Sequence, residues 1–265
     1  MEVPVMDQIS ILRLFDEERQ RIPDDDVTFS STRYVVRAIG SDGSWAGIVY
    51  SCFPAEETER IITGEIEFFA KLNRGFEWKV YSHDKPAKLL TELDRRGFQI
   101  GEEEALLIRD LRELPAALTA PPPAGVSVAP VTDANGVNDF LSVEAALWPA
   151  AEKMRNRLFA TLSDPAQREL AFVAYEGGKP IGCGRLTAPR ESRFAGLWGG
   201  AVLPDFRGRG VYRALLAARI MHILRFGSIQ YLRVDASPAS RPILERYGFQ
   251  QIASTWPADW SETRC

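Results

Sequence analysis

The second half of the chain alternates short apolar runs with longer segments in which apolar residues recur every three or four positions. The short runs predict strands and the longer segments predict helices, because side chains share a face every two residues in a strand and every 3.6 residues in a helix. From residue 126 onward the predicted order is strand, helix, helix, three strands, helix, strand, helix and strand. Asp133 is the expected N-cap of the first helix, and Gly177-Gly178 is the expected turn of a hairpin.

The first half of the chain repeats part of this order. The predicted elements are strands at 32–39 and 44–53, a helix at 54–72, a strand at 76–82, a helix at 87–98 and a strand at 105–111. Between the halves, residues 114–125 place three consecutive prolines after an alanine-rich stretch, which predicts a semi-rigid linker. We therefore expect two units, residues 1–113 and 126–265. A coincidental α+β order in the first half is the alternative.

Composition narrows the class of protein. The 265 residues are 45% hydrophobic and 26% charged, which is typical of a soluble protein. No apolar run approaches 18 residues and the acidic start shows no signal peptide, so we expect a cytoplasmic protein without a membrane partner. Cys52, Cys183 and Cys265 are far apart, and His83 beside Asp84 has no further ligand in view. These spacings favour neither disulfides nor a metal site.

Charge is distributed unevenly along the chain. Residues 126–265 carry 17 Lys and Arg against 13 Asp and Glu, whereas residues 1–125 carry 15 against 23. The acidic first part disfavours a nucleic-acid partner. The basic second part is compatible with a polyanionic small molecule, although solvated surface arginines explain the excess equally well.

The most informative stretch is VLPDFRGRGVYRALL, residues 202–216, at a predicted strand-to-helix turn. A helix N-terminus has unpaired amides and partial positive charge, which attract anions. Gly208 and Gly210 permit positive φ angles and close approach of a ligand, and Arg207 and Arg209 add two positive charges. The stretch therefore predicts a phosphate or pyrophosphate cradle. A solvated loop is the alternative.

Three kinds of phosphate cradle can be compared with this stretch. A Walker loop requires Gly-Lys-Ser/Thr, which is absent here. The dinucleotide fingerprint would have its third glycine at Arg213, and too few residues follow for a doubly wound sheet. The acetyl-CoA pattern R/Q-x-x-G-x-G/A is met at Arg207 and Gly210, with Tyr212 at a position where a small residue is usual.

The elements around this loop occur in a characteristic order. Val202 and Pro204 end the strand before it, and a second strand at 231–236 and a short helix ending at Gly248-Phe249 follow it. Over residues 126–256 this set resembles the GNAT-type N-acetyltransferase superfamily. The resemblance implies an α/β protein with a mixed α+β sheet, the acyl-CoA N-acyltransferase fold, in two tandem units. The first unit has PAEETE where the loop belongs, so we expect a degenerate GNAT-like domain without a cofactor loop.

The resemblance also implies acetyl-CoA as the cosubstrate, and no metal. Backbone amides from Arg207 to Tyr212 would hold its pyrophosphate, and the pantetheine arm would pair with Ala201 and Val202. The implied cofactor-binding residues are Ala201, Val202, Arg207, Gly208, Arg209, Gly210, Val211 and Tyr212. Gly199-Gly200 lies where this family bends a strand. A bulge there would aim an amide at the acetyl carbonyl, and close packing of a neighbouring side chain is the alternative.

The catalytic acid and base are less well defined. The Tyr that protonates the leaving thiolate in many relatives is Leu244 here, so Ser237 and Tyr247 are the candidate acids. Asp235, at the end of its strand, and Glu144, in the first helix, are the candidate bases.

One helix carries a polar stripe that we interpret as surface and not as part of a site. Arg219, His222 and Arg225 share a face of the apolar segment 211–226, and this pattern predicts the solvent-exposed edge of that helix.

The function expected from these observations is transfer of an acetyl group from acetyl-CoA to a primary amine of a small molecule or peptide by direct attack. A CoA-thioester sensor or scaffold that has lost the chemistry is the alternative, and a mycothiol synthase-like tandem enzyme is a possible subclass. A nicotinamide oxidoreductase is less favoured because the third glycine is absent. We expect a monomer or a homodimer.

Overall fold

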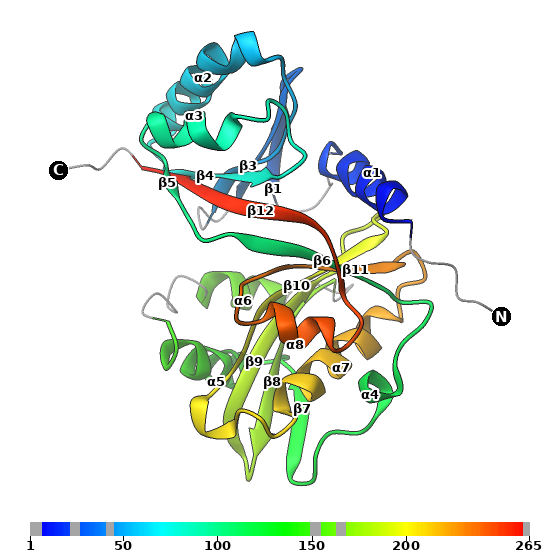
Figure 1. The fold of residues 1–265 in the computed structure, drawn as a ribbon. Helices are drawn as coiled ribbons and strands as arrows, with labels where there is room; N and C mark the ends of the chain where they lie inside the picture. The colour runs from blue at the N-terminus through cyan, green and yellow to red at the C-terminus, as the bar shows by residue number, and fades with distance from the viewer. Residues whose placement is uncertain (1–6, 22–26, 41–44, 149–154, 163–167, 262–265) are drawn as a thin grey trace. The chain divides into compact units, whose positions relative to one another are not determined.

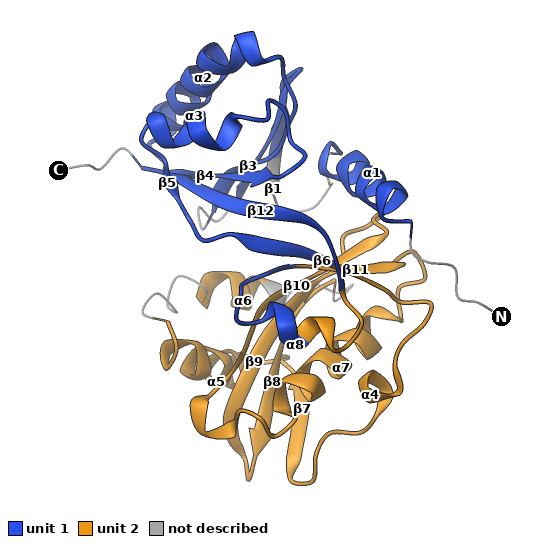
Figure 2. Cartoon of the chain, in the orientation of Figure 1, with its two compact units in different colours: residues 1–107, 235–243, 250–265 blue, residues 108–234, 244–249 orange. Residues whose placement is uncertain are grey.

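The computed structural model describes residues 7–21, 27–40, 45–148, 155–162 and 168–261 (Figure 1). The chain forms two compact units (Figure 2). Unit 1 comprises residues 1–107, 235–243 and 250–265, and unit 2 comprises residues 108–234 and 244–249. Within the described ranges, no helix is long and apolar enough to cross a bilayer.

Unit 1 is a mostly antiparallel sheet with helices. Its elements are α1 (Gln8–Arg19), β1 (Val27–Ser31), β2 (Val35–Gly40), β3 (Ala46–Ser51), η1 (Ala55–Glu57), α2 (Thr58–Lys71), β4 (Phe76–Tyr81), α3 (Leu89–Arg95), β5 (Gln99–Ile100) and β12 (Gln250–Trp260). The strand order is β1-β2-β3-β4-β12, with β5 beside β12. The β3–β4 pair is parallel, whereas β12 runs antiparallel to β4.

The core of unit 1 lies between the sheet and the helices α2 and α3, which Figure 1 shows above the strands. Ile62 and Phe69 of α2 and Leu93 of α3 are fully buried against Trp78 of β4. Trp78 is the largest of these side chains, and its indole N–H donates to the Ser51 hydroxyl (3.2 Å). Burial of an aromatic side chain with its polar atom satisfied makes this strand a central element of the core.

The elements predicted from residue 126 onward form in the predicted order, but the last of them, β12, belongs to unit 1. The elements that lie wholly or partly in unit 2 include α4 (Ala116–Thr119), β7 (Val126–Pro130), α5 (Ala134–Ala145), α6 (Arg155–Thr161), β8 (Glu169–Glu176), β9 (Lys179–Thr187), β10 (Phe194–Val202), η3 (Pro204–Phe206), α7 (Val211–Ile223), β11 (Tyr231–Ala236) and α8 (Arg241–Glu245). The strand order is β11-β10-β9-β8-β7. Asp133 caps α5 as predicted, because its carboxylate accepts the Gly136 amide.

Two helices cover opposite faces of the unit 2 sheet. A Cβ added at Gly182 or Gly184 of β9 would meet Leu215 or Arg219 of α7. Cys183, which lies between these glycines, packs instead in the cluster that contains Phe140 of α5. Alternate residues of β9 therefore face α7 and α5.

The two observed units do not coincide with the expected units, residues 1–113 and 126–265. β12 follows α8 in sequence, but it pairs with β4 and buries Ala258 in the core of unit 1. β6 (Glu104–Asp110) spans the boundary, and Leu111 after it donates its amide to the Gln230 carbonyl in unit 2 (2.9 Å). Apolar alternation shows which residues of a strand are buried, but it does not show which neighbouring strand they pair with.

The segment expected to be a linker is part of unit 2. It forms α4, and Leu118 is fully buried. The Arg213 guanidinium on α7 donates to the carbonyls of Ala117, Ala120 and Pro121. These bonds hold the alanine- and proline-rich stretch against α7. α1 and β1 are not among the elements that the sequence pattern predicts.

Candidate active site

The glycine-rich loop between β10 and α7 has the geometry predicted for an anion cradle. Gly208 and Gly210 have φ angles of 72° and 79°, a conformation that L side chains rarely adopt. Ala214 donates the first intrahelical bond of α7, to the Gly210 carbonyl (3.0 Å). The amides of residues 208–213 make no hydrogen bond of ordinary length and angle to a described acceptor. Several backbone donors are therefore available at the positive end of a 13-residue helix.

The arginines of the loop already have partners in the protein. Arg207 donates its Nε–H to the Val202 carbonyl (3.0 Å), and its amide donates to Pro204 in the η3 turn (3.2 Å). Arg209 forms an ion pair with Glu176 of β8. The side chain of Arg207 thus braces the loop, and the backbone amides after it supply the free donors.

The bulge predicted at Gly199-Gly200 is present. Pairing between β10 and β9 shifts register between Trp198 and Ala201, and Gly199 has a φ of 53°. The parallel pairing of β10 with β11 ends at Gly196, opposite Arg233. Beyond Gly196, this edge of β10 is therefore open to a strand-like ligand, as the predicted role of Ala201 and Val202 requires.

The face of the bulge toward α7 contains two large side chains. A Cβ at Gly200 would lie 3.1 Å from the Tyr212 ring and 3.3 Å from Arg219 Nη2. Arg219 is 1% exposed, and His222 packs between Phe172 and Phe226 and is also buried. The prediction that these two residues form a solvent-exposed edge is wrong, because Gly184 and Gly200 leave room for Arg219 and His222 packs against two aromatic rings.

The face of the bulge toward α5 contains a carboxylate and a guanidinium. The point that a Cβ at Gly199 would occupy lies 3.5 Å from Glu144 Oε1 and 4.0 Å from Arg185 Nε. Burial raises the pKa of the Glu144 carboxyl, and the charge of Arg185 opposes this rise. Burial also raises the pKa of the Cys183 thiol strongly, and Glu144 adds to this effect, so Cys183 stays protonated at neutral pH.

The remaining candidate catalytic residues are distributed over both units. Asp235 and Ser237 belong to unit 1, where Asp235 Oδ2 lies 3.3 Å from Lys79 Nζ and the Ser237 hydroxyl lies 3.2 Å from that of Ser240. Tyr247 belongs to unit 2 and is half-buried. Burial raises the pKa of the Tyr212 phenol, Arg219 opposes this rise, and Tyr247 adds to it. Leu244 is fully buried. The catalytic roles of Asp235, Ser237 and Tyr247 stay predictions.

The corresponding turn of unit 1 lacks the features of a cradle. After β3 the chain passes through η1, where Glu56 and Glu57 lie in the first turn, directly into α2. The residue before α2, Glu57, has a φ of −89°, and no residue between 54 and 58 has a positive φ. Carboxylates at this helix start would repel a pyrophosphate.

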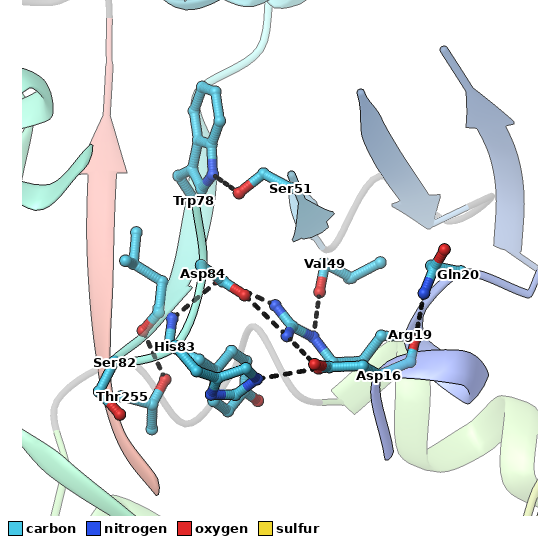
Figure 3. A network of polar contacts seen from close by, with 12 residues as sticks. Asp16, Arg19, Gln20, Val49, Ser51, Trp78, Ser82, His83, Asp84 and Thr255 are labelled. Atoms are coloured by element: carbon cyan, nitrogen blue, oxygen red, sulfur yellow. Dashed lines mark hydrogen bonds and ion pairs between the residues drawn. The ribbon is translucent and has the colours of Figure 1, made fainter. Parts of the chain in front are cut away.

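Unit 1 contains a separate polar network that our sequence analysis did not find (Figure 3). Asp16 of α1 joins His83 and Asp84, whose possible ligand atoms lie within 4.8 Å of one another. The Arg19 guanidinium already occupies the space between the carboxylates, because it donates to both Asp84 oxygens (2.9 and 3.0 Å) and to Asp16 (2.8 Å). Its Nε–H donates to the Val49 carbonyl, so the network joins α1 to the strands and is not assigned as a metal site.

Two buried arginines at the bulge, Arg185 and Arg219, were not predicted as site residues. The sequence does contain a signal for Arg219. Gly182 and Gly184 alternate in one strand, and alternate glycines indicate a sheet face that a bulky neighbour approaches closely. The signal does not identify the neighbour, because α7 and β9 are distant in sequence.

Comparisons with known proteins agree with this geometry. Residues 140–249 match the model of the acetyltransferase (GNAT) family. No curated protein sequence matches the chain. Among solved structures, a GCN5-related N-acetyltransferase from Kribbella flavida is 17% identical, with 97% of this chain and 95% of that chain covered and a TM-score of 0.68.

Two further structures share the fold. A tandem GNAT protein from the clavulanic acid biosynthesis pathway is 14% identical, with 100% and 90% of the two chains covered and a TM-score of 0.59. A GCN5-related N-acetyltransferase from Sphaerobacter thermophilus is 13% identical, with 95% and 91% covered and a TM-score of 0.60. The fold is thus the predicted acyl-CoA N-acyltransferase fold. Residues 140–249 therefore carry a domain that matches the acetyltransferase (GNAT) family, and this match, together with the shared fold, supports an acyltransferase.

Proposed function

We propose that this protein transfers an acetyl group from acetyl-CoA to a primary amine of a small molecule or peptide by direct attack. The observation that carries the proposal is the row of free amides at residues 208–213, which begins α7 directly after a bulged strand with an open edge. Such a row suits a pyrophosphate, and the open edge suits the amide groups of a pantetheine arm.

The loop has room for this ligand. No described atom lies within 4 Å of the point that a Cβ at Gly208 would occupy. The amides from Gly208 to Tyr212 would hold the pyrophosphate, and the backbone of Ala201 and Val202 would pair with the pantetheine. When bound, acetyl-CoA supplies an acetyl thioester: the amine nitrogen bonds to the carbonyl carbon, the C–S bond breaks, and the electron pair leaves on sulfur.

Residues of the bulge would assist this step in two ways. The amide at Gly199-Gly200 would donate to the carbonyl oxygen as negative charge develops there. Glu144 would take the proton that the amine loses, and its raised pKa improves its match to that task near neutral pH. We favour Glu144 over Asp235 as the base, because Asp235 is paired with Lys79.

The leaving sulfur also needs a proton. Leu244 has no proton to donate, and the Tyr247 phenol is the nearest candidate of unit 2 by sequence. Tyr247 is the second residue after α8, and its amide donates to the Leu244 carbonyl, so its position is set by the end of that helix. A thiol has an ordinary pKa of about 8.5, so a thiolate leaves without strong acid assistance.

The test adds a negative charge to the cradle and compares it with an uncharged variant that carries the same backbone strain. Gly208→Asp and Gly208→Asn both place a side chain of the same size in open space, and Asp and Asn are among the residues that tolerate a positive φ best. We expect Gly208→Asp to weaken CoA binding by at least tenfold, measured by calorimetry, while Gly208→Asn changes it by less than threefold. Release of free thiol with a panel of amines would measure transfer.

The outcomes separate binding from chemistry. CoA binding that is lost in Gly208→Asp alone, together with amine-dependent thiol release, would support the proposal. Equal CoA binding by both variants would remove the phosphate cradle from the proposal. CoA binding without thiol release for any amine would favour the sensor or scaffold instead.

A further inference from the structure

The α5-facing side of the bulge holds a guanidinium that lacks a full set of partners. The Arg185 side chain is 12% exposed, and its Nε atom is buried without a hydrogen-bond partner among the described residues. The only described carboxylate within 4.0 Å of this guanidinium is Glu169, whose Oε1 lies 3.8 Å from Nη1. Buried N–H groups are almost always paired, so an unpaired one beside a reaction site points to a ligand.

The Glu169 carboxylate does not fully neutralise the charge of Arg185, because Glu169 has a closer partner. Its Oε1 accepts the Nε–H of Arg157 on α6 at 2.6 Å. Arg157 adds a second positive charge near Arg185. Burial lowers the pKa of the Arg185 guanidinium most, and the charge of Arg157 is the next largest cause. A negative group arriving at Arg185 would therefore meet an unsatisfied donor and two cationic side chains.

The unpaired Nε atom lies beside the proposed base. Both atoms lie near the point that a Cβ at Gly199 would occupy: Arg185 Nε is 4.0 Å from it and Glu144 Oε1 is 3.5 Å from it. A side chain there would fill the space between them, and glycine leaves it open. The site thus presents one anionic and one cationic side chain to a single small volume next to the bulge.

We propose that the acceptor amine carries a carboxylate on a neighbouring carbon, as an amino acid does, with its amino group at Glu144 and its carboxylate at Arg185. This inference rests on the proposed function and specifies the acceptor. A zwitterion matches the pair of charges in sign, and its carboxylate satisfies the buried N–H. Arg185 binds and orients the acceptor, and the carboxylate is unchanged in the reaction.

The experiment compares acceptors that differ only in the anionic group. For each of several side chains, the amino acid, its carboxamide and the corresponding decarboxylated amine are assayed by thiol release with acetyl-CoA. We expect the amino acid to have a KM at least about tenfold lower than the other two, as expected for charge-assisted hydrogen bonds to a guanidinium. In Arg185→Gln this advantage should fall to less than about threefold.

A matched variant controls for charge alone. Arg157→Gln removes a positive charge of the same cluster, one that is already paired with Glu169, and should keep the preference for the carboxylate. Thermal stabilisation of the CoA-bound protein by the amino acid provides a second readout that does not depend on turnover. It should occur in the wild type and in Arg157→Gln but not in Arg185→Gln. If Arg185→Gln fails to fold, Arg185→Lys replaces it, with part of the preference retained.

Three results would overturn the inference. Carboxamides and plain amines that are acetylated as well as amino acids would remove the carboxylate requirement while leaving the proposed function intact. A requirement for Arg185 that appears only with carboxylate-bearing acyl-CoA donors would assign Arg185 to the acyl group instead. No transfer to any amine would overturn the proposed function, and the inference with it.

Discussion

Arg219 of α7 fills the space that Gly184 of β9 leaves open. Its Nη1 atom lies 2.9 Å from the point that a Cβ at Gly184 would occupy, and its Cζ atom lies 3.0 Å from that point. The guanidinium is held in place, because Nε donates to the Leu215 carbonyl (3.1 Å) and Nη1 to the Arg185 carbonyl (3.3 Å). The small Gly184 on the sheet and the large Arg219 on the helix are thus complementary in volume.

This relationship predicts that the loss of stability caused by Gly184→Ala depends on the residue at position 219. The added methyl group would displace a side chain that is 1% exposed, so we expect the substitution to destabilise the protein by about 1–3 kcal/mol. In an Arg219→Met background the flexible side chain can move away, and the same substitution should cost less than about 0.5 kcal/mol. Denaturant unfolding of the four proteins measures the difference. Equal costs in both backgrounds would show that Arg219 is not the obstacle.

Arg213 is predicted to protect the alanine- and proline-rich segment from proteolysis. Its guanidinium donates to the carbonyls of Ala117, Ala120 and Pro121. Arg213→Ala should therefore free residues 114–125 and speed cleavage there several-fold under native conditions, while the melting temperature falls by only a few degrees. Arg225→Ala, an exposed arginine of unit 2 just after α7, is the control. Unchanged cleavage in Arg213→Ala would mean that Leu118 alone holds the segment.

Glu144 is predicted to govern the pH dependence of transfer. Burial raises the pKa of its carboxyl above the ordinary 4.5, so the carboxylate needed as a base forms only at a higher pH. Activity should rise with pH through that raised pKa. In Glu144→Gln we expect kcat to fall by about 10²- to 10⁴-fold, with this rise lost from the profile of kcat/KM. Glu245→Gln, an exposed carboxylate of unit 2, is the control. A profile of unchanged shape in Glu144→Gln would exclude Glu144 as the base.

Glu77 of unit 1 is predicted to make stability depend on pH. Burial raises the pKa of its carboxyl to about 7, with Asp259 and Asp235 adding to the rise and Lys79 opposing it. Between pH 4.5 and 7 the folded state keeps a proton that the unfolded state loses, so the free energy of unfolding falls as pH increases. Glu77→Gln removes this loss.

The expected result is a pH-dependent stabilisation by Glu77→Gln. At pH 8 the variant should be about 1–2 kcal/mol more stable than the wild type, and at pH 5 the two should differ by less than half of that. Chemical denaturation at both pH values measures this, with Glu56→Gln on the exposed turn before α2 as the control. A constant difference between pH 5 and pH 8 would contradict the raised pKa.

The predicted elements of unit 2 and the cofactor loop could be found from sequence because their signals are local. The order of strands and helices after residue 126, the Asp133 cap and the positive φ angles of Gly208 and Gly210 depend on residues within a few positions of each other. Helix caps and turns are stabilised by such neighbours, so the local sequence carries the information. The bulge at Gly199-Gly200 was predicted from the resemblance together with its two glycines.

The partners of those elements were decided only by the tertiary structure. β12 pairs with β4 of unit 1 although it follows α8 in sequence, and Arg219 lies in a gap left by Gly184, which is more than thirty positions away. Arg185 and Glu144 meet at Gly199 because β9, α5 and β10 pack together. Sequence by itself determined the elements after residue 126 and the loop that attracts an anion. The residues that surround the reacting groups depend on long-range packing, which local periodicity does not specify.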